Sequence, residues 1–447
     1  MGVKMATSSA YTLNMIYGDQ VIGTLSLSPI TNLLTLNYNE QWQKTGFAVS
    51  PNLPLNSPHS AEVAYHYLDN ALPEGEARKL LADNIGVSEK NVYSQVRVIG
   101  NDLAGAFTFT TTSNTLETKQ AFFRLLEENE LTARLDNKEE IGLVTWDNKP
   151  RLSVAGVQDK LNVFINESGE IGFGDGLLCS THILKFEKKN CKNLVLNEFF
   201  CMKLSTAIGL PTAQVGFKRF GSHPALVVER FDRKYYRNEN TVKRRHVIDG
   251  CQALNLPRDY KYERNFGDGR DVKHIRDGVS LAKLFEFCQQ MKSHVASKQW
   301  LVNWQSFNLM INNFDSHGKN ISLFFDKNNA TFTPAYDLVN IAMFPQFKHV
   351  LSMAMGDEFE PDCIHAYQLA DFAETCNINK KYLSKQLINL ADKVLIQLAN
   401  NLLINSLKTE TCFTANDIQY FQQVSDNIKT RTNYLKAQAL DITNITV

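Results

Sequence analysis

The sequence has no excess of charge of either sign. Its 447 residues include 47 Lys or Arg and 47 Asp or Glu, so the formal net charge is zero. A protein that wraps nucleic acid or coats an anionic membrane usually needs a positive excess, because it must neutralise many phosphates. The balance therefore gives no sign of direct DNA or membrane binding, and any role at DNA would be local or borrowed from a partner.

The sequence also lacks paired cysteines, histidine clusters and long apolar runs. Its eight cysteines stand singly, without a CxxC pair, which indicates reduced thiols rather than a zinc site. No segment approaches the roughly 18 to 20 consecutive apolar residues that span a bilayer, and the start of the chain lacks a charged-then-apolar leader. We therefore expect a cytoplasmic protein that does not enter a membrane.

Repeats and low-complexity tracts are absent as well. The length is about three times that of a typical domain, which favours one large enzyme with a bilobal body and an appended subdomain. Residues 12–38 alternate in short runs, as an antiparallel meander does, and residues 98–110 resemble a strand. Between them, residues 60–86 have helical periodicity broken by a proline, and Ser88 resembles the N-cap of a further helix. These segments predict an N-terminal α+β subdomain over residues 1–112.

The rest of the chain divides near residue 245. Residues 113–245 predict a polar connector, which carries the amphipathic stretch AFFRLLEENE, followed by a mixed lobe of short β-rich runs around one helix. Residues 246–447 are predominantly helical, and the last helix is expected to begin at a capping box formed by Thr414 and Asp417. The predicted class is therefore α+β, with a mostly helical C-terminal lobe.

The most informative segment is residues 312–339, NNFDSHGKNISLFFDKNNATFTPAYDLV. Asp315 and Asn320 lie five residues apart, two short strands with a polar turn follow, and Asp337 comes just after the second strand. Loops before and after a hairpin can converge at the same end of it. An isolated Asp and Asn at this spacing is usually a solvated turn, but the hairpin and the second Asp weaken that alternative.

This order of residues suits phosphoryl transfer, in which an acceptor hydroxyl is oriented while magnesium ions neutralise phosphate oxygens. In protein kinases one Asp orients the hydroxyl, an Asn further along the same loop binds one magnesium ion, and an Asp after the hairpin binds the metals. The segment thus predicts an ATP- and Mg²⁺-dependent kinase site at Asp315, Asn320 and Asp337. His317 and Lys319 are close enough in sequence to assist with transition-state charge.

Upstream segments fit the same chemistry, although each has an ordinary alternative. Lys185 lies in a β-like run and could pair with nucleotide phosphates, or it could be an edge-protecting surface lysine. Glu198 in the next helix could be its ion-pair partner, or it could favour the helix dipole. The small residues around Gly156 could let backbone amides approach phosphates, or form a plain turn. Residues 225–233 could be a hinge against an adenine ring, or a buried strand that ends in a surface salt-bridged turn.

In this order the segments resemble the HipA family of bacterial serine/threonine kinase toxins. The similarity runs over nearly the whole chain, and it implies a bilobal protein-kinase-like fold with the nucleotide-binding N-lobe in residues 113–245 and the catalytic loop and metal-binding Asp in residues 246–447. The motifs that carry the resemblance are YSQVRVIGNDLAGAFTF at 93–109, SVAGVQDK at 153–160, HILKFE at 182–187, VERFDR at 228–233, CQALNLPRDYKYE at 251–263, DSHGKN at 315–320, TPAYDL at 333–338 and SMAMG at 352–356.

Carried over position by position, the resemblance implies a role for each site residue. Asp315 would be the catalytic Asp, assisted by Lys185 on the ATP phosphates, and Asn320 and Asp337 would bind Mg²⁺. Ser153 matches the serine that these kinases autophosphorylate, an inactivating event because the phosphate adds negative charge to the loop that should cradle ATP. The remaining nucleotide contacts would be Val154, Ala155 and Gly156 over the phosphates, Glu229 and Phe231 at the adenine hinge, and Gln252, His317 and Tyr336 along the site.

The resemblance also implies partners. Family members commonly phosphorylate a translation component, with an aminoacyl-tRNA synthetase as the known type of substrate. They are held inactive by a small helix-turn-helix antitoxin, so contact with DNA would be indirect. Two other functions remain open from the residues: a kinase for a small molecule, which would share the loop and hairpin, and a non-catalytic partner of a DNA-bound repressor. The last is weaker, because Asp315, Asn320 and Asp337 are all present.

Overall fold

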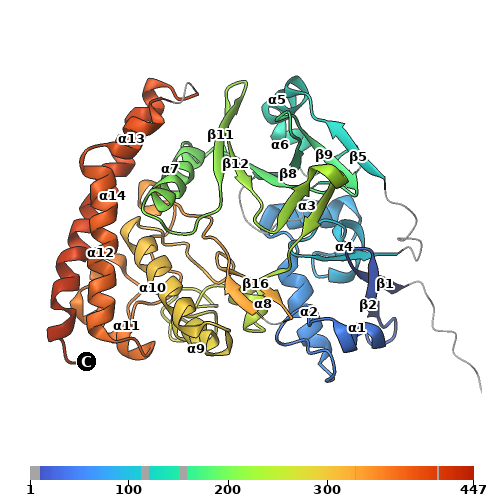
Figure 1. The fold of residues 1–447 in the computed structure, drawn as a ribbon, viewed down its shortest axis with the longest axis horizontal. Helices are drawn as coiled ribbons and strands as arrows, with labels where there is room; N and C mark the ends of the chain where they lie inside the picture. The colour runs from blue at the N-terminus through green and yellow to red at the C-terminus, as the bar shows by residue number, and fades with distance from the viewer. Residues whose placement is uncertain are drawn as a thin grey trace, which may run out of the picture.

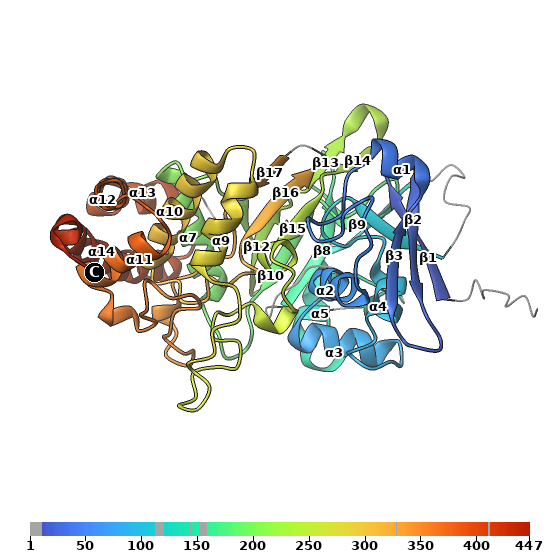
Figure 2. The ribbon, with the colours of Figure 1, turned by 90° about the horizontal axis from the view of Figure 1, so that it is seen from below.

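The computed structural model describes residues 11–111, 120–143, 145–147, 149–151, 159–327, 329–409 and 412–447. The C-terminal helices lie at one end of the long axis of the molecule (Figure 1). Towards the other end, the larger sheet lies above the small N-terminal sheet and its helices. Figure 2 shows the same arrangement from below. Segments from all three regions can therefore meet near the middle.

In the described residues, the N-terminal region is a four-stranded antiparallel sheet packed against helices. β4 pairs with β1 and completes the strand order β3-β2-β1-β4, so the predicted meander and exit strand are confirmed. The expected cap at Ser88 is wrong, because the side chain of Asn91 caps the helix instead. The elements are β1 (Thr12–Tyr17), β2 (Gln20–Leu27), β3 (Leu34–Tyr38), α1 (Glu40–Thr45), α2 (Ala61–Ala71), α3 (Gly75–Asn84), α4 (Val92–Ile99) and β4 (Phe107–Thr110).

The middle region is built on an antiparallel sheet with the strand order β11-β12-β10-β8-β9-β5. The stretch AFFRL, expected within a connector, is the edge strand β5, so this part of the chain belongs to the sheet. The elements are β5 (Ala121–Leu125), α5 (Glu128–Asp136), α6 (Lys138–Ile141), β6 (Thr145–Trp146), β7 (Lys149–Pro150), β8 (Asp159–Ile165), β9 (Ile171–Gly176), β10 (His182–Phe186), α7 (Leu194–Ala207), β11 (Val215–Phe220), β12 (His223–Glu229), β13 (Arg233–Tyr236), η2 (Arg237–Glu239) and β14 (Thr241–Arg244).

The C-terminal lobe is mostly helical and carries the predicted hairpin, β16 and β17, beside β15. The expected capping box is present, since Thr414 and Asp417 cap α14 reciprocally. The elements are β15 (Val247–Asp249), α8 (Gly250–Ala253), η3 (Arg258–Tyr260), α9 (Leu281–Phe287), η4 (Cys288–Gln290), α10 (His294–Met310), β16 (Ser322–Asp326), β17 (Asn329–Phe332), η5 (Ile341–Met343), η6 (Pro361–Cys363), α11 (Ala366–Thr375), α12 (Lys380–Ala399), α13 (Leu402–Leu407), α14 (Ala415–Asp441) and η7 (Ile442–Asn444).

One apolar core joins the N-terminal region to the C-terminal lobe. Buried side chains of the small sheet, such as Phe107, belong to the same cluster as Ile248 and Cys251 of the lobe. A second core, which includes Trp146, lies on the far face of the middle sheet. The described part of the chain contains no helix that is both long enough and apolar enough to cross a membrane. The predicted α+β class is confirmed.

Candidate active site

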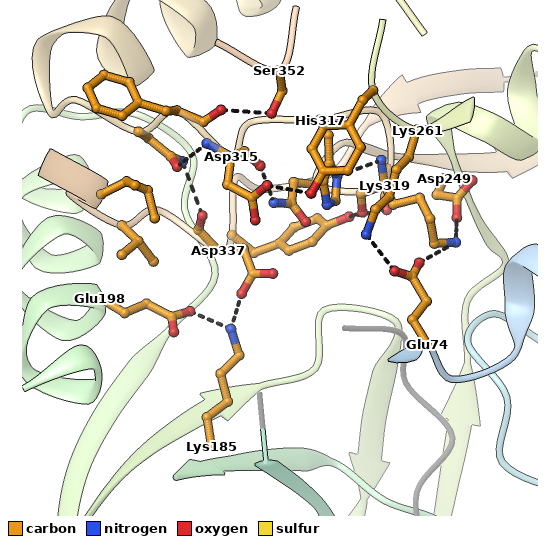
Figure 3. Close-up of a pocket in the computed structure, with 18 of the residues that line it drawn as sticks. Glu74, Lys185, Glu198, Asp249, Lys261, Asp315, His317, Lys319, Asp337 and Ser352 are labelled. Carbon is orange, nitrogen blue, oxygen red and sulfur yellow. Dashed lines mark hydrogen bonds and ion pairs between the residues drawn. The ribbon is translucent and has the colours of Figure 1, made fainter. Parts of the chain in front are cut away.

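A cleft of about 760 Å³ lies where the three regions meet. Its walls come from the middle sheet, from the loops on both sides of the β16–β17 hairpin, and from the N-terminal region through Asn70, Glu74 and Ala104. Figure 3 shows Glu74 of the N-terminal region and Lys185 of the middle sheet in this cleft. Pockets for nucleotide-sized ligands have roughly 300–1,000 Å³. The predicted site residues that lie in the described ranges all line this cleft: Lys185, Glu229, Phe231, Gln252, Asp315, His317, Asn320, Tyr336 and Asp337.

Lys185 reaches the cleft from the central strand β10. Successive side chains of a strand point to opposite faces, so Lys185 faces the cleft while Leu184 packs in the core behind the sheet. Its ammonium lies 2.5 Å from Glu198 Oε1 and also contacts Asp337 Oδ1 (Figure 3). Burial alone would lower the pKa of Lys185, but the two carboxylates outweigh burial and raise it. The lysine is therefore a buried cation held by protein charges, and the edge-protecting alternative is wrong.

Asp337 has a backbone conformation that few residues adopt. Its φ is +54°, in the left-handed region, which Asp and Asn tolerate better than most side chains. The carbonyl of Asp337 accepts a hydrogen bond from Asn313 Nδ2 at 3.3 Å, which fixes the turn. Burial would raise the pKa of Asp337, but Lys185 and Lys160 outweigh burial and hold it below its usual range. The carboxylate is therefore ionised, and it contacts the Lys185 ammonium.

The loop between α10 and β16 carries Asp315, His317 and Asn320. Asn320 Nδ2 donates to the carbonyl of Asp315 at 2.8 Å, so the other amide atom, Oδ1, remains an acceptor. Tyr262 Oη donates to Asp315 Oδ1 at 2.8 Å and orients that carboxylate (Figure 3). His317 Nδ1 accepts the backbone N–H of Lys319 at 3.2 Å, which leaves Nε2 to carry the ring proton, and burial lowers the pKa of His317.

The segment at the end of β12 both lines the cleft and binds the N-terminal region. Glu229, Phe231 and Asp232 line the cleft. Asp232 and Arg233 are also buried against the N-terminal region: Asp232 Oδ2 accepts the N–H of Gly105 at 2.9 Å, and Arg233 Nη1 donates to the carbonyl of the same glycine at 2.8 Å. The segment therefore fastens the cleft wall to the N-terminal region, and the alternative of a surface salt-bridged turn is wrong.

Gln252 and Tyr336 line the cleft with polar groups that already bind the protein. Gln252 Nε2 donates to the carbonyl of Tyr67 at 2.8 Å, and its Oε1 accepts the N–H of Asp249 at 2.9 Å. Tyr336 Oη donates to the carbonyl of Lys319 at 2.9 Å. These two side chains shape the wall rather than offer spare hydrogen-bonding groups.

Comparison with known proteins assigns the chain to a family. Residues 13–110 match the HipA N-terminal domain and residues 152–401 match the HipA-like C-terminal domain. The serine/threonine-protein kinase toxin HipA of Shewanella oneidensis is 42% identical over 390 residues, which are 87% of this chain and 89% of that protein. This chain belongs to the HipA family. The resemblance predicted from the motifs is thereby confirmed, and the chain is an enzyme of the HipA kinase class.

A solved HipA structure has the same fold. It is the complex of Shewanella oneidensis HipA with HipB and operator DNA, and its HipA-like chain superposes with a TM-score of 0.88 at 37% identity. The match covers 97% of this chain and 100% of that chain. Nearly the whole of this HipA-family chain, including its N-terminal region, therefore shares the architecture of that protein.

Part of the expected HipA-type site lies outside the described residues. This applies to Ser153 and to Val154, Ala155 and Gly156 of the expected phosphate loop. The strand that follows that loop contributes Lys160, which sequence reasoning did not assign. Lys160 is buried, pairs in register with Lys185 across β8 and β10, and lines the same cleft. Burial lowers its pKa. Its place at the end of the SVAGVQDK motif was the sequence signal.

Glu74 is a second residue that sequence reasoning missed. It lies at the N-cap position of α3 without a side-chain capping bond, and it enters the cleft from the N-terminal region. Glu74 Oε2 lies 2.6 Å from Lys261 Nζ, and Oε1 lies 3.6 Å from Lys319 Nζ (Figure 3). Lys319 also donates to Asp249 at 2.5 Å and to the carbonyl of Asn70 at 2.7 Å. Lys319 therefore holds the loop that carries Asp315 against the N-terminal region.

Replacing Glu74 by Gln is expected to destabilise the folded protein in a pH-dependent way. Burial raises the pKa of Glu74, but Lys319 and Lys261 outweigh burial and lower it to about 2, from 4.5. A depressed carboxyl pKa stabilises the fold above the unfolded value and loses that effect as the pH falls toward the folded value. The shift corresponds to about 3 kcal/mol at pH 7. Denaturant unfolding of parent and variant, from pH 7 to pH 3, should show the difference shrinking below pH 4.5.

Glu76 provides the matched control for that measurement. It lies two residues away and forms an exposed ion pair with Lys188, 3.5 Å apart. Exposed pairs contribute little, about 0–1 kcal/mol. Glu76→Gln should therefore change stability only slightly at any pH, and an equal loss in both variants would contradict a special role for Glu74.

Proposed function

We propose that this HipA-family kinase transfers the γ-phosphoryl group of ATP to a serine or threonine hydroxyl of a protein, with Mg²⁺ as the metal. One observation carries the proposal: three separate segments, which carry Lys185, Asp315 with Asn320, and Asp337, line one cleft of nucleotide size. The ionised carboxylate of Asp337 supports the proposal further, since an aspartate with only a structural role in a turn would not need a buried lysine as its partner.

The residues divide the work by their chemistry. Asp315 would accept or orient the proton of the acceptor hydroxyl, with Tyr262 keeping its carboxylate in place. Lys185 would hold the ATP phosphates as a point charge, with Glu198 fixing the lysine. Lys160 lines the same part of the cleft and adds positive charge there.

Asn320 and Asp337 are the residues we propose as ligands of the metal. Mg²⁺ is usually bound by one or two protein oxygens together with phosphates and waters, and this pair offers one amide oxygen and one carboxylate. In the described ranges, no set of three or more His, Cys, Asp or Glu side chains gathers as a metal cage, so the nucleotide's own oxygens would complete the coordination. When bound, the metal neutralises charge on the phosphates.

The remaining assignments follow the family. Glu229 and Phe231 would meet the adenine ring, and Gln252, His317 and Tyr336 would shape the rest of the nucleotide site. Val154, Ala155 and Gly156 would cover the phosphates, and Ser153 would be the residue that the enzyme phosphorylates on itself. That phosphate would place negative charge where ATP must bind and would inactivate the enzyme.

We also propose that the protein is the toxin of a toxin–antitoxin pair. A small helix-turn-helix antitoxin would bind it and carry it to DNA, as the zero net charge favours an indirect contact. The complex of the Shewanella oneidensis relative with HipB and operator DNA supports this arrangement. The substrate would be a translation component such as an aminoacyl-tRNA synthetase, which places the action in the cytoplasm.

Incubation of the purified protein with γ-labelled ATP and a cell extract tests the proposed function. Label is expected in discrete protein bands as phosphoserine or phosphothreonine, and EDTA should abolish it, because the phosphates lose their metal. Label that appears only in small solutes would favour the alternative of a small-molecule kinase. An absence of transfer with metal present would favour a non-catalytic partner of a DNA-bound repressor.

A further inference from the structure

The long helix α14 (Ala415–Asp441) packs beside α7 at the C-terminal end of the molecule (Figure 1). This helix begins at Ala415, beyond residues 152–401 that match the HipA-like C-terminal domain. Its Phe421 ring stacks on Phe200 of α7 with centroids 5.4 Å apart. Since α7 carries Glu198, α14 supports one side of the site.

Two asparagines connect α14 to the loops that carry the acidic residues. Asn312 lies three positions before Asp315 and has a left-handed φ of +55°, and Asn340 lies three positions after Asp337. Asn312 Nδ2 donates to Asn427 Oδ1 at 3.0 Å, and Asn340 Nδ2 donates to the same oxygen at 2.8 Å. One side-chain oxygen of α14 therefore joins the two loops.

The same asparagines are tied to each other and to α7. The backbone N–H of Ile341 donates to the carbonyl of Asn312 at 3.0 Å. Asn197, the neighbour of Glu198, accepts the N–H of Asn340 at 2.7 Å, and its Nδ2 donates to Tyr420 of α14 at 3.1 Å. Asn197, Asn312 and Asn340 are buried. The network therefore joins the three segments that carry Glu198, Asp315 and Asp337.

We propose that Asn427 is a positioning residue that sets the distance between the Asp315 loop and the Asp337 loop. This inference rests on the proposed function, because the two aspartates must act on one phosphoryl group. Asn427 does not line the cleft. Its effect is geometric: a displacement of about 1 Å at a reacting group can lower a rate about a hundredfold.

The surroundings of Asn427 make it a suitable residue to test. The side chain is half-buried at the edge of a polar hollow of about 640 Å³, which opens to solvent. Truncation to Ala would leave room for water to satisfy Asn312 and Asn340, so the fold should persist while the distance between the loops is no longer fixed. Asp is the conservative replacement, because Asn427 uses only an oxygen that accepts two hydrogen bonds, and a carboxylate provides the same oxygen.

The experiment compares Asn427→Ala, Asn427→Asp and the parent in full-length protein. Asn427→Ala should lower kcat for phosphoryl transfer roughly 10- to 100-fold, while the affinity for ADP in EDTA, which depends on the adenine end and Lys185, stays within about twofold. Asn427→Asp should keep most of the activity. Gln423→Ala is the matched control, since Gln423 is exposed one turn earlier on α14 and lines the same hollow.

Hydrogen–deuterium exchange separates this inference from the proposed function. Amides of residues 340–341 should exchange faster in Asn427→Ala than in the parent, whether or not the protein transfers phosphate. An inactive parent would therefore overturn the proposed function alone. Unchanged exchange and unchanged kcat in Asn427→Ala would overturn the positioning role, and an Asp variant as impaired as the Ala variant would overturn the acceptor role of Oδ1.

Discussion

Asn in place of Asp337 should lower the rate of phosphoryl transfer by roughly a thousandfold while leaving the fold in place. The substitution keeps the size of the side chain and the tolerated left-handed φ of +54°. It removes the negative charge that contacts Lys185 and that we propose as a ligand of the metal. Loss of one electrostatic contact in a closed site costs about 10²–10³ in rate, and this change removes two. Initial rates with labelled ATP and saturating Mg²⁺ measure the effect.

Asp326 supplies the control for that substitution. It ends β16 at the far end of the same hairpin, it is half-exposed, and it does not line the cleft. Asp326→Asn should transfer phosphate at close to the parental rate. If Asp337→Asn were as active as Asp326→Asn, the assignment of the site would be wrong.

Lys185→Met is expected to abolish most activity and to destabilise the fold. The substitution leaves Glu198, which is almost completely buried, and Asp337 without the ammonium that joins them. Removing one partner of a buried ion pair costs roughly 3–5 kcal/mol, because the other charge stays unpaired. The melting temperature in thermal unfolding should therefore fall, and the rate of phosphoryl transfer should fall by about 10²-fold or more.

A second substitution distinguishes the two effects of Lys185→Met. Adding Glu198→Gln removes the unpaired charge, so stability should recover in the double variant while activity stays low. Lys218→Met is the control, because Lys218 is an exposed residue of β11 in the same sheet. Recovery of activity in the double variant would show that Lys185 supports only the fold.

Local sequence signals predicted much of the catalytic lobe. The hairpin between Asn320 and Asp337 follows from strand alternation around a polar turn, and the start of α14 follows from a capping box. Both depend on residues close in sequence, where geometry is fixed by backbone preferences. The assignment of AFFRL to a connector was wrong because local signals were not enough there. A short apolar run fits a helix or a strand, and only its pairing with β9 decides between them.

Contacts between distant segments could not be predicted. Glu74 was invisible because an acidic residue at the start of a helix has an ordinary explanation in the helix dipole, and only the fold brings it to Lys261 and Lys319. Asn427 is a polar residue within an amphipathic helix, and its two partners are asparagines in loops. Neither residue type nor spacing marks such a position, because the role of the residue depends on where three separate segments of the chain meet.

The N-terminal region cannot be removed from the rest of the chain without loss of contacts that the fold and the cleft need. Cutting the chain before β5 would strip Glu74 from Lys261 and Lys319 and would remove Asn70 and Ala104 from the wall of the cleft. It would also divide a single apolar interior and leave Arg233 without the carbonyls of Gly105 and Leu103. A shortened enzyme would expose both lysine side chains and apolar core residues. We therefore expect it to aggregate rather than to fold as a smaller active kinase.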